Sequence, residues 1–354
     1  MRCRSGSGFR QDRHRDRRER ALTRVVASVP SDWYTDPAVL AHERSRVFAP
    51  HWHYVGSATD VAEPGTYMAA DLGGLPIVVT RDAGGVLRCL ANVCRHRGHV
   101  IAQGCGKRKT LQCRYHGWTY LLDGSLHAAP GADVEPADGQ LPELAVAAVG
   151  PLLVACADPT VEPLASILEP FTRLLHDVSG VELERYERRR SILHEIEANW
   201  KIVAENFMEC YHCPLVHGDT LPGYGDEEYI IDEHGTLVTH RLDRDLFSWA
   251  NLFPNTQLSA YGKHKVVIAR QLVPDGTGRT RATLDYWFDR DVDEAAAVEC
   301  IDWFETVVAE DVPLCNSVQV GCESGFLPRG LLHPEQERGP VQFEEMLIAA
   351  LADG

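Results

Sequence analysis

Four residues of one short stretch, Cys94, His96, Cys113 and His116, have the types and the spacing of a metal site. The segments CRHRG and CRYHGW each supply one cysteine and one histidine, with sixteen residues between His96 and Cys113. Thiolate and imidazole groups bind zinc or iron. A zinc site of this composition more often takes both cysteines from one segment. The mixed order instead suits a [2Fe–2S] cluster with two thiolates on one iron and two imidazoles on the other, and structural zinc or four unrelated residues are the alternatives.

Gly98 and Gly117 follow the two histidine segments, where a backbone must pass close to a cluster sulfide. Two neutral imidazoles in place of two thiolates raise the reduction potential of such a cluster, to about −150 to +300 mV. A cluster in this range accepts single electrons from a flavin or a ferredoxin. Because it does not activate oxygen by itself, an oxygen-using enzyme built on it needs a second metal centre.

A second set of ligand-type residues occurs in the stretch NWKIVAENFMECYHCPLVH. We expect a helix over residues 198–212, which places Glu205, Glu209 and His212 on one face at positions i, i+4 and i+7. His217 follows just beyond the end of that helix. Two histidines and one carboxylate on one side of Fe(II) form a facial triad, which leaves positions open for O2 and substrate.

The third ligand of such a triad must be a carboxylate that is distant in the sequence. The later helical segment offers four acids, Asp302, Glu305, Glu310 and Asp311. For any one of them a solvated helix face is the ordinary role. The spacing alone therefore leaves the third ligand open.

Cys210 and Cys213 admit a competing interpretation, as a redox dithiol or as half of a zinc site. The pair lacks the strand–helix–strand context of a redox motif, and no second Cys-x-x-Cys pair accompanies it. We interpret the two cysteines as packing residues near the iron.

The elements that position these residues fall into two parts. A helix over residues 36–48 precedes short runs rich in β-branched and aromatic residues, which predict a small antiparallel β domain with a hairpin turn at Asp123-Gly124. Beyond a loop over residues 128–143 the pattern changes. Strands are expected over 183–198, 264–274 and 280–290, and a helix from about residue 292 into the 320s, so the second domain is α+β, a curved antiparallel sheet with helices on one side.

Composition and charge narrow the class of protein. The 354 residues favour two domains, and the formal net charge of −16 disfavours a nucleic-acid binder. Nine arginines crowd the first 24 residues, so we expect residues 1–30 to be a disordered basic tail, followed by domains over 31–165 and 166–354. No apolar stretch is long enough to cross a bilayer. Eleven cysteines without a secretory signal indicate a reducing, cytoplasmic setting.

Over residues 33–348 the chain resembles the Rieske non-haem iron oxygenases, the family of ring-hydroxylating oxygenase α (terminal oxygenase) subunits. CRHRG followed by CRYHGW carries the likeness. Membrane-bound respiratory Rieske proteins have an extra cysteine in each loop, whereas this chain has His99 and Tyr115 there. The resemblance implies an N-terminal all-β Rieske [2Fe–2S] domain held to its cluster by Cys94, His96, Cys113 and His116. It also implies a C-terminal catalytic domain with a helix-grip (START-like) antiparallel sheet.

The resemblance also implies roles at the second site. The family pattern of an acid, any residue, Tyr, His, four residues and His is met by Glu209, Tyr211, His212 and His217. His212 and His217 would then bind a mononuclear Fe(II). The segment AEDVPLCNSVQVG is similar to the family segment whose aspartate closes the triad, which implies Asp311. Glu209 would link His116 of one subunit to His212 of the next.

The implied function is that of an oxygenase component that uses O2 to hydroxylate or N-demethylate a small substrate. Electrons from NADH would arrive through a separate flavin and iron–sulfur reductase or a ferredoxin, because the chain has no G-x-G-x-x-G segment after a strand. Family members are usually ring-shaped trimers, so a homotrimer without nucleic-acid or membrane partners is expected. A Rieske electron carrier is the non-enzyme alternative, although a carrier needs no second histidine pair.

The segments ENFMECYHCP and VQVGCESGFLPRGLLHPEQE are similar to those of the family branch that acts on betaine-like quaternary amines. Hydroxylation of an aromatic ring, by a mono- or a dioxygenase, is the alternative. Six aromatic residues offer the material for a cage around a quaternary cation, and each by itself is more simply a core residue: Tyr229, Phe247, Trp249, Tyr261, Tyr286 and Trp287.

Overall fold

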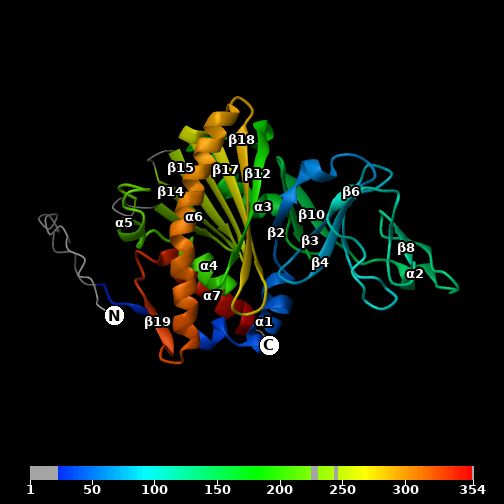
Figure 1. The fold of residues 1–354 in the computed structure, drawn as a ribbon, viewed down its shortest axis with the longest axis horizontal. Helices are drawn as coiled ribbons and strands as arrows, with labels where there is room; N and C mark the ends of the chain where they lie inside the picture. Colours follow the sequence, from blue (N-terminus) through cyan, green and yellow to red (C-terminus); the bar gives the residue numbers. More distant parts are fainter. Residues whose placement is uncertain (1–22, 225–229, 243–245, 353–354) are drawn as a thin grey trace, which may run out of the picture.

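The structure, a computed structural model, describes residues 23–224, 230–242 and 246–352. Within these residues, two antiparallel sheets of seven strands each form two units that lie side by side along the longest axis of the molecule (Figure 1). The first unit is all β, and the second packs long helices against its sheet, so the expected α+β class is confirmed. Among the described residues, none of the helices combines the length and the apolar content that a bilayer span requires.

The first unit contains a large sheet and a small three-stranded sheet that carries one of the two Cys/His loops. The large sheet has the order β2-β11-β10-β5-β4-β3-β6, formed by His53–Ser57, Leu152–Cys156, Glu143–Val149, Leu87–Ala91, Pro76–Arg81, Thr66–Asp71 and Cys105–Lys107. The small sheet comprises β7 (Thr110–Gln112), β8 (Thr119–Leu121) and β9 (Leu126–Ala128). The predicted hairpin joins β8 to β9, and Gly124 in its turn has a φ of +86° that favours glycine. A single short helix, α2 (Pro136–Gly139), interrupts the predicted loop.

The second sheet has the order β12-β18-β17-β16-β15-β14-β13. Its strands are Tyr186–Ile196, Thr280–Asp289, Val266–Pro274, Thr256–Tyr261, Phe247–Leu252, Leu237–Leu242 and Ile230–His234. The strands expected over 183–198, 264–274 and 280–290 are confirmed as β12, β17 and β18. Every residue of β15 and β16 is buried, because both faces of the sheet are covered.

Helices cover one face of this sheet, and the first unit shares the other face with one further helix. The first face packs against α4 (Trp200–Asn206), α6 (Glu294–Glu323) and α7 (Arg338–Ala352). The opposite face packs against α3 (Leu164–Asp177) and strands β2 and β11 of the first unit. The expected arrangement of helices on one side is confirmed for α4, α6 and α7, and α3 adds one helix on the second side.

The N-terminal segment packs against the second unit. Strand β1 (Val26–Pro30) pairs with β19 (Arg329–Leu332), so this part of the expected tail is a strand, whereas residues 1–22 lie outside the described residues. The predicted helix over 36–48 is confirmed as α1 (Pro37–Glu43) and the π-helical turn η2 (Arg44–Phe48). Their buried side chains belong to the core on the α6 side of the second sheet. Short turns complete the described elements: η1 (Ser31–Tyr34), η3 (Ala58–Val61), η4 (Leu183–Arg185), η6 (Gly262–His264) and α5 (Cys213–Val216).

Polar contacts fix the two units to one another. Arg188 of β12 donates to Asp60 of the first unit at 2.8 Å and to Asp285 of β18 at 3.2 Å. The ring of His53 lies 2.6 Å from Oδ1 of Asn255. Because these side chains are mostly buried, their hydrogen bonds hold the first unit at a defined orientation on the second sheet.

Candidate metal centres

The two Cys/His loops of the first unit have the same backbone design. In one, the amide of Gly98 donates to the carbonyl of Cys94 at 2.9 Å, and in the other Gly117 donates to Cys113 at 3.0 Å. Gly98 has a φ of +73° and Gly117 a φ of +74°, a left-handed conformation that a side chain would strain. The first loop follows β5, and the second joins β7 to β8.

The structure brings the four predicted cluster ligands together. The side chains of Cys94 and Cys113 are buried, whereas His96 and His116 are exposed, and the centroids of the two imidazole rings lie 4.6 Å apart. The hydroxyl of the buried Tyr120 lies 3.2 Å from Sγ of Cys94. Two buried thiols and two surface imidazoles form a donor set that fits a [2Fe–2S] cluster, which would take two thiolate and two imidazole ligands.

The expected helix over residues 198–212 is wrong in its second half. Helix α4 ends at Asn206, and the chain turns before it reaches Glu209 and His212. Glu205, the first of the three positions on the expected face, lies elsewhere and accepts a hydrogen bond from Tyr34 at 2.9 Å. Glu209 and His212 still meet, because carboxylate oxygens of Glu209 contact the amide nitrogens of Tyr211 and His212 as well as the His212 ring.

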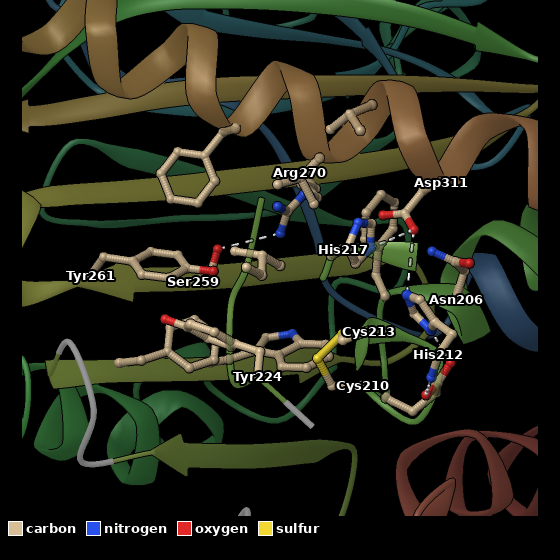
Figure 2. A pocket seen from close by; sticks show the side chains of 18 residues that line it. Asn206, Cys210, His212, Cys213, His217, Tyr224, Ser259, Tyr261, Arg270 and Asp311 are labelled. Atoms are coloured by element: carbon tan, nitrogen blue, oxygen red, sulfur yellow. Dashed lines mark hydrogen bonds and ion pairs between the residues drawn. A yellow bond between two sulfur atoms is a disulfide. The ribbon is translucent and has the colours of Figure 1, made fainter. Parts of the chain in front are cut away.

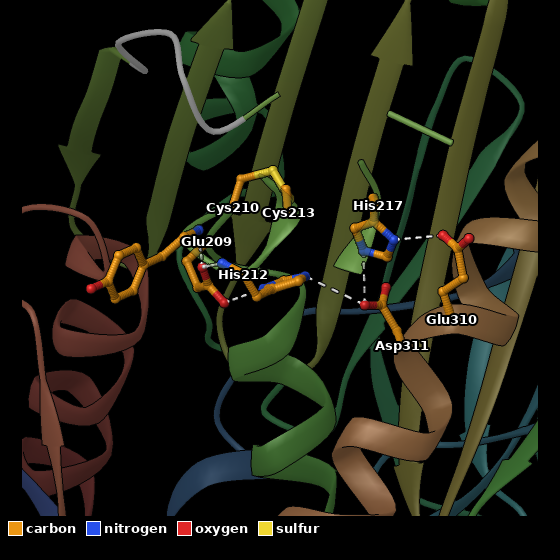
Figure 3. The surroundings of a disulfide bond; sticks show 8 residues. Glu209, Cys210, His212, Cys213, His217, Glu310 and Asp311 are labelled. Carbon is orange, nitrogen blue, oxygen red and sulfur yellow. Dashed lines mark hydrogen bonds and ion pairs between the residues drawn. A yellow bond between two sulfur atoms is a disulfide. The ribbon is translucent and has the colours of Figure 1, made fainter. Parts of the chain in front are cut away.

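Two histidine rings converge on one aspartate (Figure 3). Nε2 of His217 lies 3.1 Å, and Nε2 of His212 lies 3.4 Å, from Oδ1 of Asp311. His217 and Asp311 are buried, and the centroids of the two rings are 5.3 Å apart. A single ion that replaces the proton shared by these groups would have two nitrogen ligands and one oxygen ligand on one side, the donor set of a non-haem iron site.

A second carboxylate contacts each ring at its other nitrogen, Nδ1. Nδ1 of His217 lies 2.7 Å from Oε2 of Glu310, and Nδ1 of His212 contacts Oε1 of Glu209. Burial lowers the pKa of His212, but the hydrogen bonds with Asp311 and Glu209 outweigh it and raise that pKa to about 10. Binding of a metal at Nε2 would therefore release a proton, while the outer carboxylate keeps the hydrogen on Nδ1.

Two of the other candidate acids of α6, Asp302 and Glu305, lie away from this point. Asp302 is exposed, and Glu305 accepts a hydrogen bond from Tyr286 at 2.5 Å. Asp311 falls in the buried stripe of the helix at the helical spacing of its apolar neighbours, which include Phe304, Val308 and Cys315. The rotation of α6 thus presents Asp311 to the two histidines and leaves Glu310 beside His217.

A cavity extends from the three converging residues between α6 and the sheet (Figure 2). Of the six aromatic residues considered for a cage, Phe247, Trp249 and Tyr261 line it. Tyr286 and Trp287 do not line it, and Tyr229 lies outside the described residues. Three further aromatic rings and one cation, which the sequence did not indicate, also line it: Phe207, Tyr224, Phe304 and Arg270.

Cys210 and Cys213 form a disulfide that borders the same cavity (Figure 3). Our interpretation of the pair as packing residues missed this bond, for which the Cys-x-x-Cys spacing was the available signal. The two cysteines lie on either side of His212 in the sequence. The disulfide therefore closes the turn that carries this ring.

Both units match known protein families. The family described as Rieske [2Fe-2S] domain matches residues 51–145, and that described as ring hydroxylating alpha subunit (catalytic domain) matches residues 183–242 and 233–353. The chloroplastic choline monooxygenase of Beta vulgaris is 30% identical over 338 residues, which cover 89% of this chain and 75% of the relative. The carnitine monooxygenase oxygenase subunit of Acinetobacter baumannii is 28% identical over 343 residues, 90% of this chain and 91% of the relative. A solved quaternary ammonium Rieske monooxygenase in complex with L-carnitine is similar with a TM-score of 0.80 and 27% identity, over 92% of this chain and 96% of the other.

Proposed function

The chain belongs to the Rieske non-haem iron oxygenase α subunits, and we propose that it is the oxygenase component of a system that oxidises a quaternary amine with O2. The observation that best supports this substrate class is the aromatic lining of the cavity beside His212, His217 and Asp311. Aromatic faces attract quaternary ammonium groups, which form no hydrogen bonds. The named substrates of the relatives, choline and carnitine, support the same class.

Each predicted ligand has a role in this proposal. Cys94, His96, Cys113 and His116 hold the [2Fe–2S] cluster, and a second ion, Fe(II), is held by His212, His217 and Asp311. When bound, the cluster supplies single electrons and the lone iron supplies O2 activation. The contacts of both sets of side chains, described above, support these assignments.

The surrounding residues orient the ligands and keep water out. Glu209 and Glu310 hold hydrogen at Nδ1 of His212 and His217, so that both rings present Nε2 to the ion. Apolar side chains of α6, Phe304, Val307 and Val308, form one wall of the cavity. The substrate would lie against the rings of Phe247, Trp249 and Tyr261 with an N-methyl group toward the iron.

Electron transfer between the two centres requires a second subunit in this proposal. The loop before β8 lies toward one end of the long axis of the chain, and α5 lies toward the other end (Figure 1). The exposed His96 and His116 would dock on the Glu209 face of the next subunit, and Glu209 would link His116 to His212. Such a head-to-tail contact closes into a ring, for which a homotrimer is the expected form.

A separate reductase or ferredoxin supplies the electrons, as in other members of the family. We propose that these electrons come from NAD(P)H and pass through a flavin in that partner. Six of the described cysteines, Cys89, Cys105, Cys156, Cys300, Cys315 and Cys322, are neither in the disulfide nor among the proposed cluster ligands, and such unpaired thiols support a reducing, cytoplasmic setting.

Oxygen uptake tests the proposal. Protein reconstituted with iron and sulfide is mixed with NADH and a surrogate reductase, and it is offered betaines, carnitine, choline and aromatic acids in turn. We expect uptake with quaternary amines and release of an aldehyde product. The variant His212→Ala should keep the absorbance of the cluster, lose about one iron per chain and lose uptake. Uptake with aromatic acids alone, or full uptake by His212→Ala, would refute the proposal.

A further inference from the structure

A buried cation stands in an otherwise apolar row of the second sheet. On β17, the alternating residues Val266, Ile268 and Leu272 face the core beside α6, and Arg270 belongs to the same row, between Ile268 and Leu272. Arg270 is only 9% exposed, and its side chain lines the cavity that extends from His217 and Asp311 (Figure 2). A charged side chain at such a position opposes the ordinary preference of a sheet core.

The contacts of Arg270 leave most of its hydrogen-bonding capacity unused. One terminal nitrogen donates to Oγ of Ser259 at 3.3 Å, and the guanidinium lies 4.8 Å from the centroid of the Phe207 ring. Nε is buried and has no hydrogen-bond partner. Among the ion pairs of the described residues, none involves Arg270.

The nearby acids have other partners. Glu305 interacts electrostatically with Arg270, but its carboxylate contacts the hydroxyl of Tyr286 and the ring of His194. Asp311 faces His212 and His217. The guanidinium is therefore a buried charge without a direct counter-ion among these residues, and such a charge is costly unless a partner arrives.

We propose that Arg270 binds a carboxylate of the substrate, so that the natural substrate is a betaine, a quaternary amine that also carries a carboxylate. This inference rests on the proposed function and narrows its substrate class. A guanidinium offers paired N–H groups in the geometry that a carboxylate accepts. The aromatic rings of the same cavity take the quaternary nitrogen, and Arg270 takes the opposite charge.

The same arrangement disfavours a quaternary alcohol. Choline would bring a second positive charge into a cavity that already holds Arg270 and would leave the guanidinium unpaired. A zwitterion pairs with both kinds of group. The cavity thus selects by charge as well as by shape, which an aromatic cage alone does not do.

Binding to the reconstituted holoenzyme under anaerobic conditions, measured by calorimetry, tests the inference without turnover. The ligands are glycine betaine, L-carnitine, choline and the tert-butyl analogue of glycine betaine, in which carbon replaces the nitrogen. The variants are Arg270→Gln, Arg270→Lys and, as a matched control, Arg281→Gln, which changes an exposed arginine on neighbouring β18. Cluster absorbance and melting temperature establish that each variant is folded.

We expect the wild type and Arg281→Gln to bind a betaine at least about tenfold more tightly than choline, and Arg270→Gln to lose that preference. Arg270→Lys should regain part of it, which a purely structural role would not produce. Equal binding of betaines and choline by the wild type, or an unchanged preference in Arg270→Gln, would overturn the inference and leave the proposed function intact. If the tert-butyl analogue binds as tightly as glycine betaine in an Arg270-dependent way, the carboxylate site stands and the quaternary-amine function fails. Binding of none of the four ligands would overturn both.

Discussion

Nδ1 of His217 lies 2.7 Å from Oε2 of Glu310, on the side of the ring opposite Asp311. Glu310 and Asp311 are consecutive residues of α6, yet they contact the two different nitrogens of one imidazole. The other oxygen of Glu310 accepts a hydrogen bond from Thr220 at 2.6 Å, which fixes the carboxylate. One turn of helix thus supplies both a candidate ligand and the group that orients a candidate ligand.

The variant Glu310→Gln should weaken iron binding at the second site by about 10–100-fold. The neutral amide accepts the hydrogen bond from Nδ1–H of His217 more weakly than the charged carboxylate, so the ring is oriented less firmly toward the iron. Iron retained after dialysis against a chelator measures the effect, and the absorbance of the cluster should not change. Asp302→Asn, on the exposed face of the same helix, is the control. Iron retention equal to that of the wild type would show that Glu310 has no orienting role.

The variant Glu209→Gln should weaken iron binding as Glu310→Gln does, because Glu209 orients the His212 ring, and in chains loaded fully with iron it should also slow electron transfer between the two centres by about 10–100-fold. Glu209 contacts the ring of His212, and its side chain is 11% exposed, so a neighbouring subunit can reach it. Stopped-flow absorbance of the reduced cluster, mixed with O2 and substrate, gives the rate. The exposed residue Glu195 offers a control as Glu195→Gln. Reoxidation at the wild-type rate would remove Glu209 from the electron path.

The long elements of the second unit were predictable from the sequence, even where both of their faces are buried. Strands β17 and β18 and helix α6 were expected close to their observed bounds, although most residues of β17 and β18 are buried. Strands β10 and β11 were not predicted, although Gly150 and Pro151 between them were an available signal for the turn of the hairpin they form. The end of α4 at Asn206 could not be predicted, because no glycine or proline marks it and the side chain of Glu209 stabilises the turn that follows.

Some residues of the candidate site could be predicted from the sequence, and others could not. The Cys/His and His/His spacings predicted residues that the structure does bring together, since ligands on short loops are close in sequence. The choice between Glu310 and Asp311 depends on the rotation of α6 about its axis, which only packing determines. Arg270 was visible as an interruption of the apolar run VVIARQLV, and we did not use that signal. Its meaning depends on the cavity, which the sequence does not reveal.

Protein purified in air should contain the disulfide between Cys210 and Cys213. Alkylation of the denatured, cluster-free chain without reductant should therefore modify two fewer cysteines than the eleven modified after reduction, as counted by mass spectrometry. The double variant Cys210→Ser/Cys213→Ser should show nine in both cases. It should also lose about 2 kcal/mol of stability in the turn that carries His212 and release iron faster. Eleven reactive thiols without reductant would contradict the bond.

Lys201 and Glu43 form an ion pair that is completely buried, with 2.6 Å between Nζ and Oε1. Trp200 donates to the other oxygen of Glu43 at 2.8 Å. The variant Lys201→Met should lower the free energy of unfolding by about 3–5 kcal/mol, because it leaves a carboxylate buried without its counter-ion. Urea denaturation measures the change, and Lys109→Met on an exposed loop is the control. The double variant with Glu43→Gln should regain part of the loss, and a small effect of Lys201→Met alone would indicate that Glu43 finds another partner.

Tyr34 joins a partly buried and a buried carboxylate, since its hydroxyl lies 2.9 Å from Oε1 of Glu205 and 3.2 Å from Oε1 of Glu344. Burial, reinforced for Glu205 by the neighbouring charge of Glu344, raises the pKa of Glu205 to about 8, and burial raises the pKa of Glu344 to about 7. Both values exceed the ordinary 4.5 of an unfolded glutamate, so the folded chain binds more protons between these limits.

The stability that these two groups contribute should therefore be complete below about pH 4.5 and be lost as the pH rises toward about 8. In the steepest part of that window each group changes the free energy of unfolding by up to about 1.4 kcal/mol per pH unit. The variant Glu205→Gln removes one of the two titrations, so its stability should fall less steeply than that of the wild type between pH 5 and pH 8. Urea denaturation at a series of pH values gives both slopes, and Glu345→Gln, an exposed neighbour on α7, should keep the wild-type slope. A Glu205→Gln slope equal to that of the wild type would mean that Glu205 is ionised in the folded protein at neutral pH, with Tyr34 and Lys201 stabilising its charge.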